Sequence, residues 1–483
     1  MPPENRILLE ELERLLQPVT LEQKVRSFVF SKTWGHLDVA DGDGEEENDE
    51  LTNANSLDAH QRVVSGVEEL AKEVSDDESL LQELLPDLLS DGSGRQYAFG
   101  KGLALASPDV IARWSRLCLF FSQIEPSKRD TRLLAGFVEG AALVDAAATE
   151  GFLDGAVRDP VLAEYFPLLQ GEQCNDAAGK RLLDSLEHSV APISRYYWVS
   201  RGLRGGGMSA LIHRAILLKL AQLPGGYQVA IDALGMELHV HRSEKSLPAA
   251  ELISLGRELL NMFNFEVNDD NFAYHLNEVA IVCMRGQDAT AVAVGLCQRF
   301  AEALKNYRSG VDSFRKLAET LFKHQTAAAL DAFLGQPPTA LGHPLLTRFS
   351  LSKKSVVNSA PIDELLAWVS LEPAVRAPLL AAEIEIHCIG ADGVLSWSPI
   401  AASLLGLAPN KQDVLDKFAE CFHPRAWSGS ISGVLRPFQE LVMQLAKNED
   451  ATVAAWAKGQ LALMADRIVH ESRIDQRIDE RFE

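Results

Sequence analysis

The sequence predicts an all-α protein built as an α-solenoid of degenerate HEAT-like helical hairpins, and three observations lead to this fold class. Apolar residues recur with the helical period over most of the 483 residues. Gly, Pro, Asn and Asp separate segments of about 12–20 residues, so that a pair of helices occupies about 30–45 residues, the size of one solenoid repeat. Convincing strand patterns are nearly absent, and the signature residues of TPR and ankyrin repeats are missing.

The N-terminal part, residues 1–95, is expected to be an acidic helical segment. It holds 23 Asp and Glu residues against 8 Lys and Arg, so it carries most of the formal net charge of −22. Apolar periodicity over residues 7–16 and 21–30 predicts two short helices. Near residues 40–55, a run of acids that repel one another and bury nothing predicts a disordered loop. An EF-hand is excluded because Glu46 and Thr52 replace the Gly and Glu that its loop needs.

Residues 96–340 are expected to form the main helical-repeat solenoid. Ser107-Pro108 and Asp159-Pro160 place a capping side chain before a proline, which is typical of helix starts. Glycine-rich breaks at 205–207 and 225–226 indicate helix ends. The clearest expected helices cover 108–123, 129–146, 160–169, 177–190, 208–223, 227–239, 249–263, 272–284, 289–307 and 311–334.

A stretch rich in Pro, Ser and Lys near 335–361 is expected to separate this body from a C-terminal helical unit, residues 361–483. A second break in the helical rhythm falls near 390–399. The unit ends in a long charged helix from about Asp450, in which Ile474, Ile478 and Phe482 recur at i, i+4 and i+8. This apolar stripe predicts docking onto a neighbour.

The motifs of common enzymes are missing, so we expect a non-enzymatic chain with no catalytic residue, no cofactor and no metal. The nearest approach to a phosphate-binding loop, around Gly100 and Lys101, has Arg95 in place of the first Gly and Gly102 in place of Ser or Thr. Its glycines instead predict close helix packing. No serine lies in the register of a nucleophile elbow, G-x-S-x-G.

An alternative is an all-helical enzyme whose residues converge from distant repeats. The histidine motifs closest to a metal or hydrolytic site are Glu237-Leu-His239-Val-His241, His275-Leu-Asn-Glu278 and His387-Cys388. His275 and Glu278 would share one helix face. Such pairs are also common on solvated helices, and none of these motifs has a second matching motif to complete a metal shell. The six cysteines are scattered and are expected to be reduced, buried side chains.

A partner-binding surface is predicted where large rings, cations and a glycine break follow one another. These residues, together with the C-terminal stripe, are the candidate partner-binding set: Tyr196, Tyr197, Trp198, Arg201, Arg204, Ile474, Ile478 and Phe482. The competing interpretation is that the aromatic side chains fill gaps between hairpins.

Composition also bounds the partners. The body has no basic excess, which does not favour direct nucleic-acid binding, because that affinity comes from Lys and Arg displacing counterions. No apolar run reaches the length that spans a bilayer, and the first residues lack the layout of a signal peptide. We therefore expect a cytoplasmic protein without membrane contact.

Several segments resemble the helical-repeat C-terminal regions of large bacterial proteins, among them STAND-type NTPases linked to antiphage defence. They are Ala426-Trp427-Ser428-Gly429-Ser430, the segment 451–457 with Trp456, the charged C-terminus, Phe99-Gly-Lys-Gly-Leu103 and Leu133-Leu-Ala-Gly-Phe137. The resemblance implies a sensor or scaffold that binds a protein partner, either a defence-complex subunit or a phage protein. The sequence lacks the nucleotide-binding and effector domains of those large proteins, which implies either the sensor part of a larger protein or a free subunit whose effector acts in trans. A third hypothesis is a structural assembly subunit that docks through its C-terminal helix and is regulated by its acidic loop.

Overall fold

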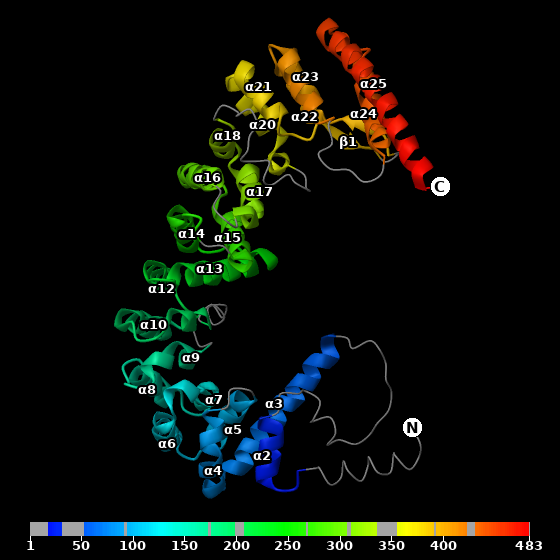
Figure 1. Cartoon of the computed structure of the whole chain (residues 1–483). Coiled ribbons are helices and arrows are strands. Elements are labelled where there is room, and N and C mark those ends of the chain that lie inside the picture. Colours follow the sequence, from blue (N-terminus) through cyan, green and yellow to red (C-terminus); the bar gives the residue numbers. More distant parts are fainter. Residues whose placement is uncertain are drawn as a thin grey trace, which may run out of the picture. The chain divides into compact units, whose positions relative to one another are not determined.

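The computed structural model describes residues 18–30, 53–90, 94–171, 175–198, 207–266, 269–306, 311–335, 355–390, 393–422 and 430–482. These residues are almost entirely helical (Figure 1), which confirms the all-α class. Most of the acidic loop expected near 40–55 and the helix expected at 7–16 lie outside them. The chain divides into two compact units, residues 1–233 and 234–483, and the division falls inside helix α13.

Unit 1 is a series of helices, and several of them begin at a local capping side chain. Thr20 accepts a hydrogen bond from the Gln23 N–H while the Gln23 side chain accepts from the Thr20 N–H, a complete capping box for the first described helix. The elements are α2 (Leu21–Val29), α3 (Asn53–Ser75), α4 (Glu78–Leu88), α5 (Gln96–Ala106), α6 (Val110–Gln123), η2 (Pro126–Lys128), α7 (Arg132–Val144), α8 (Ala146–Ala156), η3 (Ala163–Tyr165), α9 (Phe166–Gln170), α10 (Asp176–His188), η4 (Ile193–Trp198) and α12 (Ala210–Gln222).

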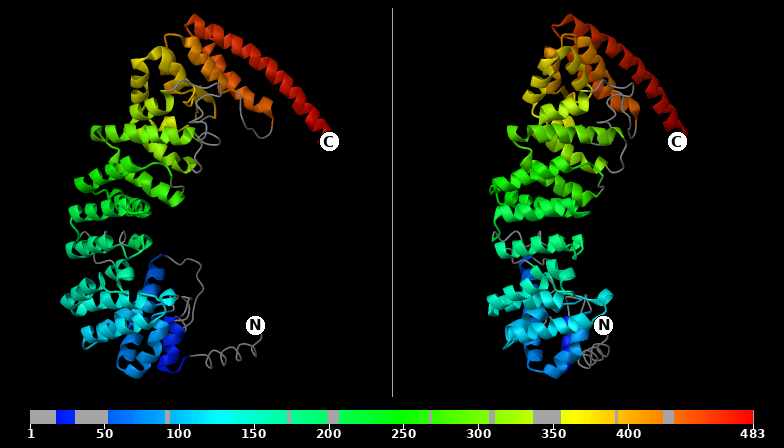
Figure 2. Two further views of the ribbon diagram at one scale, coloured as in Figure 1. Left: turned by 60° about the vertical axis from the view of Figure 1, so that its left-hand side comes forward. Right: turned by 90° about the vertical axis from the view of Figure 1, so that its left-hand side faces the viewer.

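Most helices of unit 1 pack in two rows, in which a helix contacts the helix two places further along the chain. One row runs α3, α5, α7 and α9, and the other runs α4, α6 and α8. Neighbours in sequence, such as α7 and α8, pack across the rows. In Figure 1, α5 and α7 lie beside α6 and α8, and Figure 2 shows the same helices, coloured blue to cyan, from two further directions. Helices such as α7 therefore bury one face on their own row and one on the other row.

The closest packing in unit 1 is between α5 and α7, where glycines bring the two backbones together. A Cβ atom on Gly136 would lie 1.9 Å from the Tyr97 carbonyl oxygen, and one on Gly100 would lie 2.0 Å from the Leu133 carbonyl oxygen. A Cβ on Gly140 would lie 2.5 Å from the Lys101 oxygen. The prediction that the glycines around Lys101 allow close helix packing is confirmed.

The expected boundary at residue 95 falls inside this packed group. The Arg95 backbone N–H donates to the Val29 carbonyl, and its guanidinium donates to the Phe28 carbonyl at 2.6 Å. Immediately afterwards α5 begins and packs on both α3 and α7. Residue 95 thus joins α2 to α5 within unit 1.

Unit 2 continues the alternation of rows. One row runs α14, α16, α18, α20 and α22, and the other runs α15, α17 and η8. The elements are α13 (Gly226–Ser243), α14 (Ala250–Met262), α15 (Asp270–Cys283), η6 (Gln287–Ala289), α16 (Thr290–Lys305), η7 (Val311–Phe314), α17 (Arg315–His324), α18 (Thr326–Leu334), η8 (Val356–Ser359), α20 (Ile362–Leu371), α21 (Pro373–Ala381), β1 (His387–Ile389), β2 (Leu395–Trp397), α22 (Pro399–Leu407), α23 (Lys411–Glu420), α24 (Ile431–Leu445) and α25 (Ala451–Phe482).

Aromatic rings fill the core between these rows. Phe265 adopts a φ of +59°, which is rare for a bulky residue, and its ring stacks 4.5 Å from that of Phe300. Phe263 and Phe314 pack on Phe265 at centroid distances of 4.4 and 5.4 Å. The surrounding rings therefore hold a backbone conformation that the local sequence does not favour.

Two details differ from the sequence-based expectation. The helix expected over 311–334 is broken into α17 and α18 at Gln325, whose side-chain amide donates to the carbonyls of Met284 and Gly286, both at 2.9 Å. The rhythm break near 390–399 contains an antiparallel hairpin in which His387 pairs with Trp397 and Ile389 pairs with Leu395. The long final helix begins at Ala451, as expected, with the Asp450 carboxylate as its cap.

Candidate functional site

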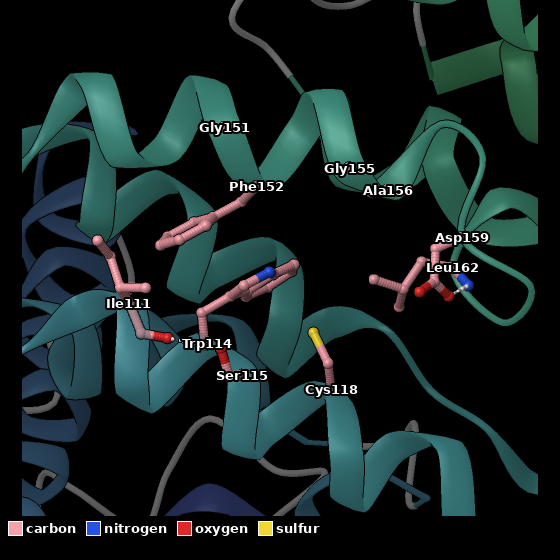
Figure 3. A pocket seen from close by; sticks show the side chains of 10 residues that line it. All are labelled: Ile111, Trp114, Ser115, Cys118, Gly151, Phe152, Gly155, Ala156, Asp159 and Leu162. Carbon is pink, nitrogen blue, oxygen red and sulfur yellow. Dashed lines mark hydrogen bonds between the residues drawn. The ribbon is translucent and has the colours of Figure 1, made fainter.

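A groove lies between α6 and α8 in unit 1, with a volume of about 280 Å³. Asp109 caps α6 by accepting from the N–H groups of Ile111 and Ala112, so the helix starts two residues after the proline that was expected to begin it. The Trp114 ring forms part of the groove and stacks on Phe152 of α8, with centroids 5.1 Å apart. Figure 3 shows the two rings facing each other between the helices.

The groove is open because α8 presents glycines to it. Gly151 and Gly155 are four residues apart and therefore share one face of α8. A Cβ atom added at either position would meet no atom within 4 Å. The missing side chains leave space above Trp114, and Ile111, 55% exposed, stands at the edge of that space.

One carboxylate gives the groove its charge. Asp159 Oδ1 accepts hydrogen bonds from the backbone N–H groups of Val161 and Leu162 at 2.8 and 2.9 Å, which fixes the side chain at one end of the groove (Figure 3). Burial, and to a lesser extent this carboxylate, raises the pKa of the Cys118 thiol to about 12, so Cys118 is a neutral thiol. Among the described residues that line the groove, none is cationic.

A second pocket, of about 410 Å³, lies among α22, α23, α24 and β2 in unit 2. Its polar groups are engaged within the protein. The Lys411 ammonium pairs with the Asp450 carboxylate, and the Trp397 indole N–H donates to the Leu441 carbonyl at 3.0 Å. The Gln444 amide donates to the Leu395 carbonyl. Side chains that line this pocket are therefore held by contacts within unit 2.

The aromatic part of the predicted partner-binding set does not form one surface. Tyr196 is 1% exposed, its hydroxyl lies 2.7 Å from Ser185 Oγ, and burial raises its pKa. The Tyr196 ring thus packs inside unit 1 and fills a gap, as the competing interpretation held. Tyr197 is 38% exposed. The Trp198 side chain, Arg201 and Arg204 lie outside what the structure describes.

We expect Tyr196→Phe to lower the free energy of unfolding by about 1 kcal/mol, because the Ser185 hydroxyl loses its buried partner. Tyr197→Phe should change that free energy less, since Tyr197 is 38% exposed and water can replace what its hydroxyl contacts. Urea denaturation of both variants measures the difference. Equal effects at the two positions would contradict the buried role of Tyr196.

The C-terminal stripe is described only in part. Ile474 is 37% exposed on α25. Ile478 and Phe482 lie within the bounds of the same helix, but their side chains are outside the described set. Upstream, α25 packs on α23 and α24. Asp475 also accepts hydrogen bonds from Ser430 and Ser432, so the helix is tied to unit 2 up to this residue.

Two of the histidine motifs come together on α13 and α15 in unit 2. His239 Nδ1 lies 3.2 Å from Glu278 Oε2 and 3.1 Å from the Tyr274 hydroxyl. Arg242 Nη2 lies 2.8 and 2.7 Å from the two Glu278 oxygens. Glu278 is only 3% exposed, so its charge is balanced by Arg242. An imidazole beside a carboxylate is an arrangement that proton-transfer sites use.

The other histidines of these motifs have structural roles. His275 is buried, and desolvation lowers its pKa. It packs where Gly235 of α13 meets α15, since a Cβ on Gly235 would lie 2.8 Å from the His275 Cβ. His241 Nδ1 lies 2.7 Å from the Ser246 hydroxyl. In the part of the chain that the structure describes, no group of three or more His, Cys, Asp or Glu side chains could hold a metal ion.

Sequence reasoning missed the α6/α8 groove. Its signal is faint: an exposed glycine pair on α8, Gly151 and Gly155, with a tryptophan, Trp114, on the preceding helix of the same row. The same reasoning found His239 and Glu278 separately and did not join them. They lie 39 residues apart and meet only because α13 packs on α15.

None of the described helices has the length and apolar character needed to cross a membrane. Comparisons of the chain with protein-family models, with curated proteins and with solved structures give no match.

Proposed function

We propose that the chain is a helical-repeat scaffold or sensor of the α-solenoid type, with degenerate HEAT-like hairpins, that binds a protein partner. The observation that carries this proposal is the alternate-helix packing within each unit. Helices stacked in two rows bury their apolar faces on each other, and solenoid proteins bind partners on the extended concave surface that such stacking creates.

The outer surface of unit 1 supports the proposal. Large apolar side chains stand exposed on it, among them Ile111 and Leu119 of α6 and Leu143 of α7. Ile111 also lines the α6/α8 groove, and an exposed apolar side chain at the edge of a groove is a contact that a protein partner can cover. A binding role of this kind requires no cofactor.

The resemblance to antiphage-defence proteins suggests the biological setting of the partner. Two of the segments that carry the resemblance, 99–103 and 133–137, lie on α5 and α7 and pack directly on each other. Such contact is what hairpin elements of a repeat region would make. We propose on this basis that the partner is a subunit of a bacterial defence complex or a phage protein.

The test is native co-purification. The tagged full chain is expressed with its neighbouring genes, with and without phage infection, and proteins retained in moderate salt are identified. We expect a stoichiometric ATPase, nuclease or phage protein. Recovery of the chain alone under both conditions would overturn the scaffold proposal.

The second candidate function is an enzyme, favoured by the His239–Glu278 pair. An all-helical hydrolase would use His239 as a base oriented by Glu278. In that case Glu278→Gln should abolish any hydrolytic activity of the purified chain while the protein remains folded.

A structural assembly role predicts instead that the chain forms oligomers that are lost when residues 476–483 are deleted, a truncation that keeps the contacts of Asp475.

A further inference from the structure

We propose that the α6/α8 groove binds a segment of a partner protein that inserts one bulky apolar side chain next to a Lys or Arg. This inference rests on the proposed scaffold function and names the site and the class of partner. It follows from the size of the groove, from the chemistry of its walls and from its charge.

The size suits a single bulky side chain. The groove volume of about 280 Å³ lies at the lower end of the roughly 300–1,000 Å³ that ligand pockets occupy. The groove is also continuous with the exposed Ile111 on its edge, so a bound segment can extend across the helix surface. A partner chain gains contacts there that an isolated small molecule would not make.

The walls favour an apolar anchor. The Trp114 and Phe152 rings are nearly buried, and Ala156 and Leu162 complete an apolar lining. The Trp114 ring is held by a further stack on Phe137, with centroids 6.1 Å apart. A rigid aromatic floor limits the entropy lost when a side chain binds. The neutral thiol of Cys118 adds no charge to this lining.

The negative charge of the groove favours a basic partner residue beside the anchor. Asp159 is fixed by its two backbone hydrogen bonds, and no cation lines the groove among the described residues. A Lys or Arg next to the anchor would meet this carboxylate. The chain as a whole has a formal charge of −22, which favours the approach of a basic partner and disfavours an acidic one.

The glycines allow the groove to be filled without harming the fold. Gly155→Leu adds a side chain where a Cβ meets no atom within 4 Å, and Leu is a better helix former than Gly. Asp159→Asn removes the charge but keeps a side chain that caps equally well. Gly66→Leu is the matched control, because Gly66 on α3 also faces open space and does not line the groove.

A library of displayed random 12-residue peptides is selected for binding to the immobilised full-length chain. The selected peptides are then synthesised, and their affinity is measured by fluorescence anisotropy. We expect the selected peptides to share an aromatic or aliphatic residue beside Lys or Arg. Gly155→Leu should weaken their binding by about thirtyfold, as loss of an anchor pocket does. Asp159→Asn should weaken it by about threefold at low salt and reduce its salt dependence. Gly66→Leu should bind like the wild type.

Three results of the peptide experiment would overturn the inference: no enriched peptide, enrichment of acidic peptides, or selected peptides that bind Gly155→Leu as tightly as the wild type. Thermal denaturation of each variant verifies that it is folded. Co-purification decides the scaffold function separately, so a stoichiometric partner recovered with both wild type and Gly155→Leu would leave that function standing and reject the groove as its site.

Discussion

Gly136→Ala is expected to lower the free energy of unfolding of unit 1 by about 1–3 kcal/mol, the usual cost of overpacking. The new Cβ would lie 1.9 Å from the Tyr97 carbonyl oxygen, which belongs to the backbone of α5 and cannot rotate away. The helices α5 and α7 must therefore move apart, and the buried residues at their crossing lose contacts. This loss exceeds the gain of about 1 kcal/mol that Ala normally gives over Gly inside a helix.

The matched control is Gly66→Ala on α3, where the added Cβ meets no atom within 4 Å. It should raise the free energy of unfolding by about 0.5–1 kcal/mol. Urea denaturation gives the overall change, and hydrogen exchange of α5 and α7 peptides localises it. If Gly136→Ala stabilised the chain as Gly66→Ala does, the backbone contact between α5 and α7 would be refuted.

The double variant Gly100→Ala, Gly136→Ala tests whether the two glycines serve one crossing. Each new Cβ would meet the opposite backbone within about the same short distance, 2.0 and 1.9 Å. Once one substitution has separated the helices, the second meets less resistance. The loss of stability in the double variant should therefore be smaller than the sum of the losses in the two single variants. Full additivity would show that the two contacts are relieved independently.

The helices of this protein are predictable because their signals are local. The starts of α2 and α25 follow from Thr20, Gln23 and Asp450, and the final helix begins within a residue of its expected position. The glycines near Lys101 also indicated close packing. The sequence did not indicate that their partner would be α7, because the complementary glycines Gly136 and Gly140 lie more than thirty residues away and only the fold aligns them.

Features that depend on tertiary contacts were harder to predict. The break at Gln325 is stabilised by hydrogen bonds to the carbonyls of Met284 and Gly286, about forty residues earlier, so the local apolar pattern runs through it. The groove was missed for a different reason: it is formed by side chains that are absent, at Gly151 and Gly155. Periodicity shows where apolar groups lie, but it does not show which exposed glycines face a neighbouring helix.

Glu237→Gln is expected to stabilise the chain by about 3 kcal/mol at pH 8 and to have little effect at pH 4.5. Glu237 lies partly buried on α13, and this burial raises its pKa from the usual 4.5 to about 7. A shift of one pKa unit corresponds to about 1.4 kcal/mol between the two protonation states. Gln has the same shape as protonated Glu and carries no charge at any pH, so the variant never has a buried charge to desolvate.

The direction of the pH dependence follows from the two pKa values. Between pH 4.5 and about 7 the folded chain keeps the Glu237 proton while the unfolded chain has lost it. The stability that protonated Glu237 contributes is therefore fully present below pH 4.5. It is lost as the pH rises to about 7, and above that pH the loss stays constant. His213 acts in the opposite direction, because burial lowers its pKa to about 4 and its charging destabilises the fold as the pH falls.

The difference between wild type and Glu237→Gln isolates the one group, since His213 and the other histidines are present in both proteins. Thermal denaturation from pH 4.5 to 8.5 should show a difference in Tm that grows to about 5–10 °C at pH 8 and then stays level. Glu251→Gln, at an exposed position on α14, should leave Tm nearly unchanged throughout. A constant Tm difference for Glu237→Gln across this range would mean that Glu237 is not protonated in the folded chain. The stabilisation would then have to come from packing of the amide.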